Sequence, residues 1–119
     1  MPEGTYAKGL AGEAGAVAYL QKRGMVLLTQ RYRSPFGEID AVMADGETLV
    51  FVEVKARRTR ARGTGLLAVD VRKQRKIIRT ALQYLGEHDC QCVIRFDVVE
   101  WTADGFLHIP DAFQGSEFH

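Results

Sequence analysis

Charged side chains interrupt two apolar segments near the middle of the chain. Asp40 stands at the start of the apolar run that ends at Met43, and Glu53 and Lys55 close the apolar run that starts at Leu49. Strands rich in Val, Phe and Leu normally keep charge off their buried faces, because an unpaired buried charge is costly. Binding a divalent metal ion and a phosphate group would account for three ionisable groups on one sheet face.

Side chains alternate between the two faces along each of these segments. In residues 49–55 the odd-numbered positions, Glu53 and Lys55 among them, share one face. In the preceding segment, Glu38 and Asp40 share a face. If the two segments pair, their charged groups lie on a common face of the sheet.

The link between the segments predicts a hairpin. Asp45-Gly46 is a strong signal for a two-residue loop, which would pair Asp40 with Phe51. Glu53 would then lie diagonally from Asp40, roughly 7–8 Å away at the backbone. Magnesium usually keeps several of its waters, so two or three carboxylates at this spacing suffice to bind it.

A third carboxylate comes from the N-terminal segment. Residues 5–22 predict a helix in which Glu13 falls in the middle of the apolar stripe. The stripe consists of Tyr6, Leu10, Val17 and Leu20. For Glu13 alone, pairing of a partly buried carboxylate with an arginine is the more common explanation. With Asp40 and Glu53 nearby, a shared metal site is favoured.

Three glycines weaken this predicted helix. Gly9, Gly12 and Gly15 each cost it about 1 kcal/mol relative to alanine. They either permit close packing on the sheet or mark a weak helix start.

These residues carry a resemblance to a known superfamily. Glu13, Asp40 and the triplet Glu53-Val54-Lys55 resemble the PD-(D/E)xK nucleases. More closely, the chain resembles the uncharacterised bacterial YraN-like family, which is related to archaeal Holliday junction resolvases. The matching segments span nearly the whole chain in the family's order: Gly12-Glu13 with 18–20, 37–40, 51–55 with Arg57, Ala68-Val69 with Lys73, 95–99, and Ala112-Phe113. The chain departs from the family at Arg31, where asparagine is frequent, and in the arginine-rich residues 57–62.

The resemblance implies metal-dependent phosphodiester hydrolysis. Glu13, Asp40 and Glu53 would hold one or two Mg²⁺ or Mn²⁺ ions, with the Val54 carbonyl as a further ligand. Lys55 would orient the attacking water or neutralise the phosphate. Glu38 is a weaker candidate beside them. The alternative is an ion-pair cluster on an exposed sheet face, which the ordered set of motifs disfavours.

The distribution of charge favours a nucleic-acid partner. The net charge is only +1, but 10 of the 16 Lys and Arg residues lie between Lys55 and Arg79, with Asp70 as the one acid there. Such clustering is typical of phosphate binding. Four arginines follow directly after the metal motif: Arg57, Arg58, Arg60 and Arg62. A solvated basic loop is the alternative interpretation.

A second helix is predicted from about Val69 to Gly86. Its first half carries Arg72, Lys73 and Lys76, and cations there oppose the helix dipole, so phosphate binding is the better explanation for them. Gln74, near the centre of the apolar stripe, and Lys73 are second-tier candidates for the metal site. Gln74 is equally well explained as a polar residue at the helix boundary.

Length and element order predict one α/β domain over residues 1–119, with 115–119 as a flexible tail. The expected architecture is a restriction-endonuclease-like core, a mixed β-sheet flanked by α-helices. A strand is expected at 93–101 with Asp97 in a structural pair, then a short strand at 107–109 and a packing element at 110–113. No apolar run spans a membrane and no signal-peptide core is present, so a cytoplasmic protein is expected. Cys90 and Cys92 are too close and too few for a disulfide framework or a zinc site, and they fit a reducing cytosol.

Two functions therefore remain. The first is a metal-dependent endonuclease acting on DNA, including branched or damaged DNA. Junction cleavage would require a homodimer, because two active sites are needed. The second is a non-catalytic nucleic-acid-binding or adaptor domain on a nuclease scaffold. The intact Glu13, Asp40, Glu53 and Lys55 favour the first.

Overall fold

The computed structural model describes residues 3–56, 69–89 and 91–114. Two helices and five strands lie within the described residues. They are α1 (Glu3–Lys22), β1 (Val26–Ser34), β2 (Gly37–Asp45), β3 (Thr48–Ala56), α3 (Val71–Glu87), β4 (Val93–Thr102) and β5 (Gly105–Phe113). The predictions for the arginines at 57–62 and for the tail at 115–119 lie outside the described residues.

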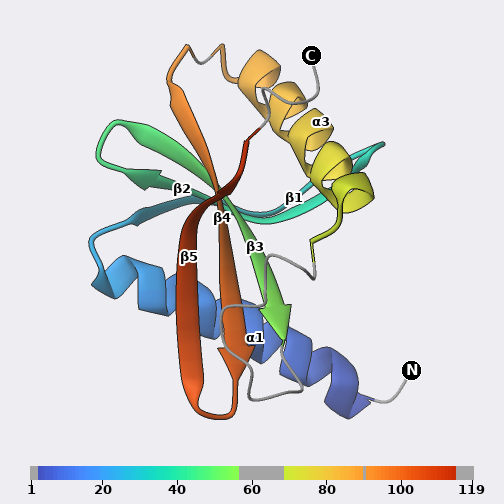
Figure 1. Cartoon of the computed structure of the whole chain (residues 1–119), viewed down its shortest axis with the longest axis vertical. Helices are drawn as coiled ribbons and strands as arrows, with labels where there is room; N and C mark the ends of the chain where they lie inside the picture. Colours follow the sequence, from blue (N-terminus) through green and yellow to red (C-terminus); the bar gives the residue numbers. More distant parts are fainter. Residues whose placement is uncertain (1–2, 57–68, 90, 115–119) are drawn as a thin grey trace.

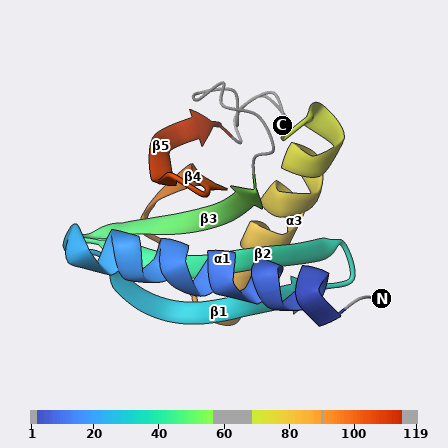
Figure 2. The same cartoon turned by 90° about the horizontal axis from the view of Figure 1, so that it is seen from below.

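The five strands form one sheet in the order β1-β2-β3-β4-β5. Strands β3 and β4 are parallel and are separated in sequence by α3, whereas every other neighbouring pair is antiparallel. Helix α1 covers one face of the sheet and α3 covers the other (Figures 1 and 2). The predicted α/β fold with a mixed sheet flanked by helices is confirmed, and it is consistent with a restriction-endonuclease-like core.

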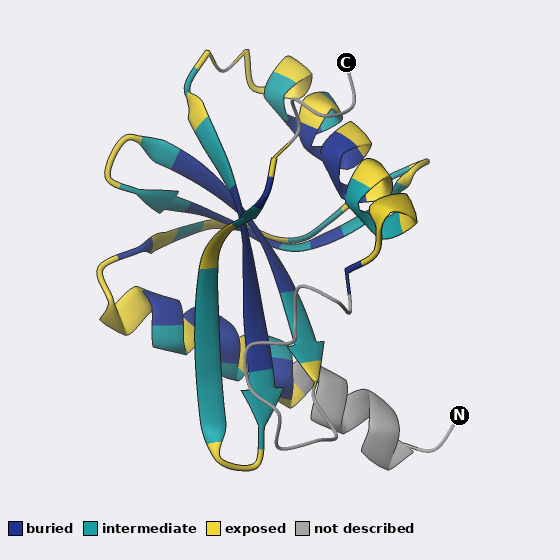
Figure 3. Ribbon diagram, in the orientation of Figure 1, coloured by how far each residue is buried: buried dark blue, intermediate teal, exposed yellow. Residues whose placement is uncertain are grey.

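The predicted alternation of side chains along β3 is also confirmed. Leu49 and Phe51 pack in the cluster beneath α3, whereas Val50 and Val52 pack in the cluster beneath α1. Both faces of the central strands are therefore covered, and the middle of β3 and of β4 is buried (Figure 3). A charged side chain in this region needs a partner, because it is removed from water.

The predicted register of the β2–β3 hairpin is wrong by one residue on each strand. Asp45 pairs with Thr48, so the two-residue loop is Gly46-Glu47 and Phe51 lies opposite Val42 rather than Asp40. Gly46 has φ 59° at the first loop position, as in a type II′ turn. This shift keeps Ala41, Val42 and Met43 on their predicted faces, but Ile39 packs beneath α3 together with Val42, so strict alternation fails towards the start of β2. Continued by one step, the register places Asp40 opposite Glu53.

Two glycines seat α1 closely against the sheet. A Cβ added to Gly12 would lie 2.8 Å from Trp101 Cε3, and one added to Gly15 would lie 2.5 Å from Phe106 Cζ. Close packing, one of the two explanations left open by the sequence, therefore accounts for both positions. The surroundings of Gly9 lie outside the described side chains. This contact fixes the position of Glu13, which stands between the two glycines.

Strand β5 is longer than predicted and includes residues 110–113, which were expected to form a separate packing element. Asp97 explains the difference. Its carboxylate accepts hydrogen bonds from Arg95 at 2.8 and 2.9 Å and from the Asp111 backbone N–H at 2.9 Å, and it contacts His108 Nε2 at 2.7 Å. These bonds support the irregular pairing between Phe96 and Val98, and they confirm a structural role for Asp97.

Two further expectations concern the setting of the protein. No described helix is long and apolar enough to cross a membrane. Cys92 is disulfide-bonded, which does not fit the expectation of cysteines suited to a reducing cytosol. Its neighbour Cys90 lies outside the described residues.

Candidate metal centre

The candidate site lies where β2 and β3 stop pairing. Their last paired residues are Ala41 and Val52. Just beyond them, Asp40 Oδ2 accepts a hydrogen bond of 2.7 Å from the backbone N–H of Val54. The N–H and C=O of one strand residue point to the same side, so the Val54 carbonyl also faces the space between the strands. An acidic side chain and a backbone carbonyl thus face one opening in the sheet.

Two carboxyl groups meet at this opening. Glu53 is 6 % exposed, and its charge acts on Asp40 across the two strands. Burial, followed by repulsion from Glu53, raises the pKa of Asp40 to about 7, although the Val54 N–H favours the ionised form. A bound cation would favour ionisation of both groups. The predicted proximity of Asp40 and Glu53 is present, with the two opposed rather than diagonal.

Glu13 and Glu38 complete an acidic cluster around Asp40. One carboxylate oxygen from each of these three residues lies within 4.8 Å of the other two. Glu13 reaches the cluster from α1, and Glu38 shares a face of β2 with Asp40. Glu38 therefore belongs with the main candidates, although the sequence ranks it lower. Glu53 borders the cluster on the β3 side.

An arginine side chain pairs with the carboxylate of Glu13. Arg31 of β1 forms an ion pair with the Glu13 carboxylate, which is 13 % exposed. Burial and the nearby charge of Asp40 raise the pKa of Glu13 above its usual value, while Arg31 opposes the shift. Arg31 has φ 55°, a left-handed conformation that asparagine tolerates better than arginine. Both explanations of Glu13, an arginine pair and a place in an acidic cluster, describe its surroundings.

Two lysines face Glu53. Lys73 Nζ lies 3.2 Å from Glu53 Oε1. Burial disfavours the charge on Lys73, but Glu53 and Asp40 outweigh it, so the pKa of Lys73 lies above its usual value. Burial and the charge of Lys73 lower the pKa of Lys55, which shares the face of Glu53. The site thus has carboxylates on one side and two ammonium groups on the other.

The start of α3 explains the position of Lys73. Asp70 caps the helix by accepting a hydrogen bond of 2.9 Å from the Lys73 backbone N–H. Gln74 donates to the Val69 carbonyl at 2.8 Å, so the helix-boundary interpretation of Gln74 matches its contacts. The residue that α3 brings to the carboxylates is Lys73.

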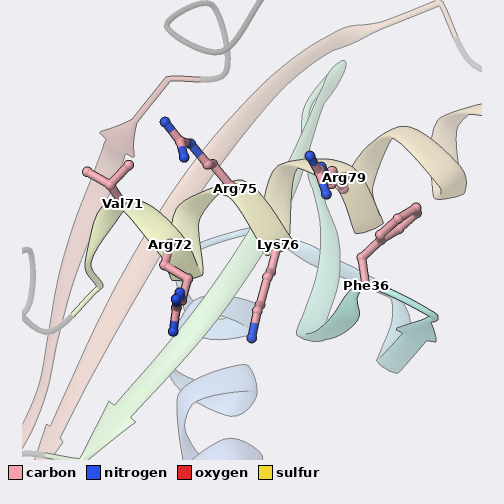
Figure 4. A pocket seen from close by; sticks show the side chains of 6 residues that line it. All are labelled: Phe36, Val71, Arg72, Arg75, Lys76 and Arg79. Carbon is pink, nitrogen blue, oxygen red and sulfur yellow. The ribbon is translucent and has the colours of Figure 1, made fainter.

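The remaining predicted phosphate-binding residues divide into two groups. Arg57, Arg58, Arg60 and Arg62 lie outside the described residues. Arg72 and Lys76 lie on the exposed side of α3 and extend to the same side of the helix (Figure 4). Between them and the β1–β2 turn lies a groove that the sequence analysis does not predict.

The fold and this cluster together define a class of protein: an α/β protein that gathers acidic side chains where two strands of a mixed sheet separate. The chain belongs to the Uncharacterised protein family UPF0102, whose model matches residues 12–100. It is 48% identical over 122 residues to a UPF0102 protein of Chlorobium chlorochromatii, covering 94% of this chain and 95% of the relative.

Two other members of the family match this chain with a lower identity or over a smaller share of it. A UPF0102 protein of Desulfosudis oleivorans is 47% identical over 92 residues, covering 76% of this chain and 75% of the relative. A UPF0102 protein of Persephonella marina is 38% identical over 110 residues, covering 92% of this chain and 95% of the relative. These names state the family and no activity. The predicted membership of the YraN-like family is confirmed.

Proposed function

We propose that the protein is a metal-dependent endonuclease that hydrolyses phosphodiester bonds in DNA. The observation that carries this proposal is the acidic cluster: oxygen atoms of Glu13, Glu38 and Asp40 lie within 4.8 Å of one another. Like-charged groups repel at this spacing, and a divalent cation relieves the repulsion. Lysines 55 and 73 stand beside the cluster, where a phosphate group would need positive charge.

The residues present fit Mg²⁺ or Mn²⁺, because both ions prefer oxygen ligands. Asp40 and Glu13 would hold the ion, with Glu38, Glu53 and the Val54 carbonyl as further ligands. When bound, the ion would lower the pKa of a coordinated water and stabilise the negative charge on the phosphoryl oxygens.

The chain's own groups would prepare the substrate for this reaction. Lys55 and Lys73 would place the phosphate against the carboxylates by charge attraction. Lys55, whose pKa is lowered by burial and by the charge of Lys73, would orient the attacking water through a hydrogen bond. Glu53 itself is buried, so little solvent reaches its carboxylate.

A second candidate function is a non-catalytic DNA-binding or adaptor domain. The observation that favours it is that Arg31 and Lys73 already pair with Glu13 and Glu53. These ion pairs partly neutralise the carboxylates without metal. Under this alternative the cluster is a structural ion-pair network, and the basic residues of α3 alone contact nucleic acid.

A cleavage assay separates the two functions. Labelled single-stranded, duplex, flap and four-way-junction DNA would be incubated with Mn²⁺, Mg²⁺ or EDTA. Asp40→Asn is the test variant. Asp104→Asn, an equivalent change at an exposed position in the β4–β5 turn, is the matched control. The proposal expects metal-dependent products with wild type and Asp104→Asn and none with Asp40→Asn.

The opposite result is equally informative. If wild type cuts none of these substrates while it and Asp40→Asn bind DNA equally at low salt, the non-catalytic function replaces the nuclease. Sedimentation of the protein with and without junction DNA would show whether a homodimer forms, as paired cleavage of a junction requires.

A further inference from the structure

A groove with an unusual lining lies between the β1–β2 turn and α3. Two of its residues are apolar and exposed, four are cationic, and none is acidic. The lining consists of Phe36, Val71, Arg72, Arg75, Lys76 and Arg79 (Figure 4). A surface of this composition suits a ligand that is both negatively charged and aromatic.

The turn that carries Phe36 is held in place, although Phe36 itself is 45 % exposed. Ser34 Oγ accepts hydrogen bonds from the backbone N–H groups of Phe36 at 3.0 Å and of Gly37 at 3.3 Å. The same hydroxyl lies 2.8 Å from the hydroxyl of Thr80, a buried residue of α3. The turn is therefore fastened to the helix, and the exposure of Phe36 is a fixed feature of the fold.

A cation lies over the same ring. The Arg79 guanidinium carbon is 5.7 Å from the ring centroid of Phe36, within the range of a cation–π interaction. An exposed ring flanked by arginine is the arrangement on which unpaired nucleic-acid bases stack. Cations in the first half of α3 oppose the helix dipole, and its first turn has no acidic residue, so helix stability does not explain them.

Two elements of the chain connect the lining of the groove with the acidic cluster. Phe36 stands just before β2, and Glu38 and Asp40 follow on that strand. On α3, Lys76 lies one turn beyond Lys73, about 5 Å along the helix axis, and Lys73 contacts Glu53. A strand held in the groove would thus lead into the carboxylates.

We propose that the groove binds an unpaired nucleotide next to the phosphate that the acidic cluster would receive. The base stacks on Phe36 and Arg79, while Arg72 and Lys76 bind the adjoining phosphates. An unpaired base is required because the faces of a base inside a duplex are covered by its neighbours. This inference rests on the proposed function and deepens it, because it gives the substrate a single-stranded segment.

Binding measurements in EDTA test the groove without cleavage. Fluorescence anisotropy would compare the full chain on a short single strand and on a duplex of the same sequence at low salt. Phe36→Ala is expected to weaken single-strand binding roughly 5- to 150-fold, as for the loss of one base–aromatic stack. Duplex binding should change little, and Phe36→Trp should keep the affinity. Leu28→Ala, at a residue of similar exposure on β1, is the matched control.

A second readout reports stacking directly. Fluorescence of 2-aminopurine in the single strand should be quenched by wild type and by Phe36→Trp, and not by Phe36→Ala. Thermal melting of each variant checks that it folds. The proposal would be overturned if Phe36→Ala lost affinity equally for the single strand and the duplex, or lost no affinity for either. Competition by an acidic peptide as strong as that by an oligonucleotide would also overturn it, because an acidic protein surface would then be the better ligand.

The outcomes for the two proposals stay separate. If Phe36→Ala loses single-strand binding and wild type cuts nothing, the groove stands and the nuclease function fails. If wild type cleaves and Phe36→Ala binds normally, the nuclease stands and the groove proposal fails.

Discussion

The side chain of Asp40 accepts the backbone N–H of Val54 across 2.7 Å, just beyond the last paired residues of β2 and β3. This bond stabilises the end of the pairing but places a carboxylate beside Glu53. Burial and the charge of Glu53 raise the pKa of Asp40 to about 7. The molecule therefore combines a structural hydrogen bond with an electrostatic repulsion at one side chain.

The raised pKa of Asp40 predicts how metal-free stability depends on pH. Between about pH 4 and pH 7 the folded protein holds a proton on Asp40 that the unfolded chain releases, so this group's contribution falls as pH rises through that window. Asp40→Asn keeps an oxygen for the Val54 N–H and removes the charge. Urea unfolding in EDTA should therefore give Asp40→Asn a higher free energy of unfolding than wild type at pH about 8, by on the order of 2 kcal/mol.

At about pH 3 that difference should nearly vanish, because Asp40 is then largely protonated in both the folded and the unfolded state of the wild type. Asp40→Ala serves as the contrast, since it removes the acceptor for the Val54 N–H as well as the charge. A variant Asp40→Asn that is less stable than wild type at every pH would show that the repulsion is absent.

Divalent metal should stabilise the protein only where Asp40 can ionise. Mn²⁺ at about 100 times its dissociation constant should add about 2.7 kcal/mol at pH about 8, with a rise of several degrees in Tm. Near pH 5.5 the effect should shrink, because protonated Asp40 is a poor ligand. Differential scanning fluorimetry would measure it, with Asp104→Asn expected to match wild type. The same rise in Asp40→Asn would place the metal elsewhere.

The sequence predicts much of this arrangement because alternation along strands is local information. The faces of Glu53 and Lys55 follow from a period of two along β3 and survive the error in register, whereas the position of Ile39 shows that the alternation fails beside Asp40. The register itself depends on whether Gly46 occupies the first or second loop position, and Asp45-Gly46 is compatible with both.

Contacts between distant elements explain what the sequence does not predict. Glu38 joins Glu13 because α1 lies against the opening between β2 and β3, a feature of the assembled sheet. The Lys73–Glu53 ion pair depends on where α3 begins relative to β3. Phe36 reads in sequence as an ordinary turn residue, and only the fastening of that turn to α3 makes its ring part of a groove.

Arg31 should compete with metal for Glu13. Arg31→Asn removes a positive charge from the acidic cluster, and asparagine tolerates the φ of 55° at this position. Affinity for Mn²⁺ should rise about tenfold or more, because a cation no longer repels the ion. Isothermal titration calorimetry would measure the change.

The matched control for this prediction is Arg23→Asn. Arg23 lies ten residues beyond Glu13 in sequence, just past the end of α1 and about 15 Å away by helical rise. Arg23→Asn removes the same charge as Arg31→Asn, and it should leave the affinity for Mn²⁺ unaltered. Equal gains in both variants would indicate a general electrostatic effect rather than competition at Glu13.

The glycine that seats α1 should be intolerant of a single added methyl group. In Gly12→Ala, the new Cβ would stand 2.8 Å from the Trp101 ring, so helix and strand must move apart. The expected cost is about 1–3 kcal/mol from overpacking, against a gain of about 1 kcal/mol in helix propensity. Gly86→Ala in α3 is the matched control, because nothing lies within 4 Å of its added Cβ. Urea unfolding should show Gly12→Ala destabilised and Gly86→Ala stabilised. If both variants gain stability, the contact with Trp101 is too loose to position Glu13, and the geometry of the acidic cluster must be fixed by Arg31 instead.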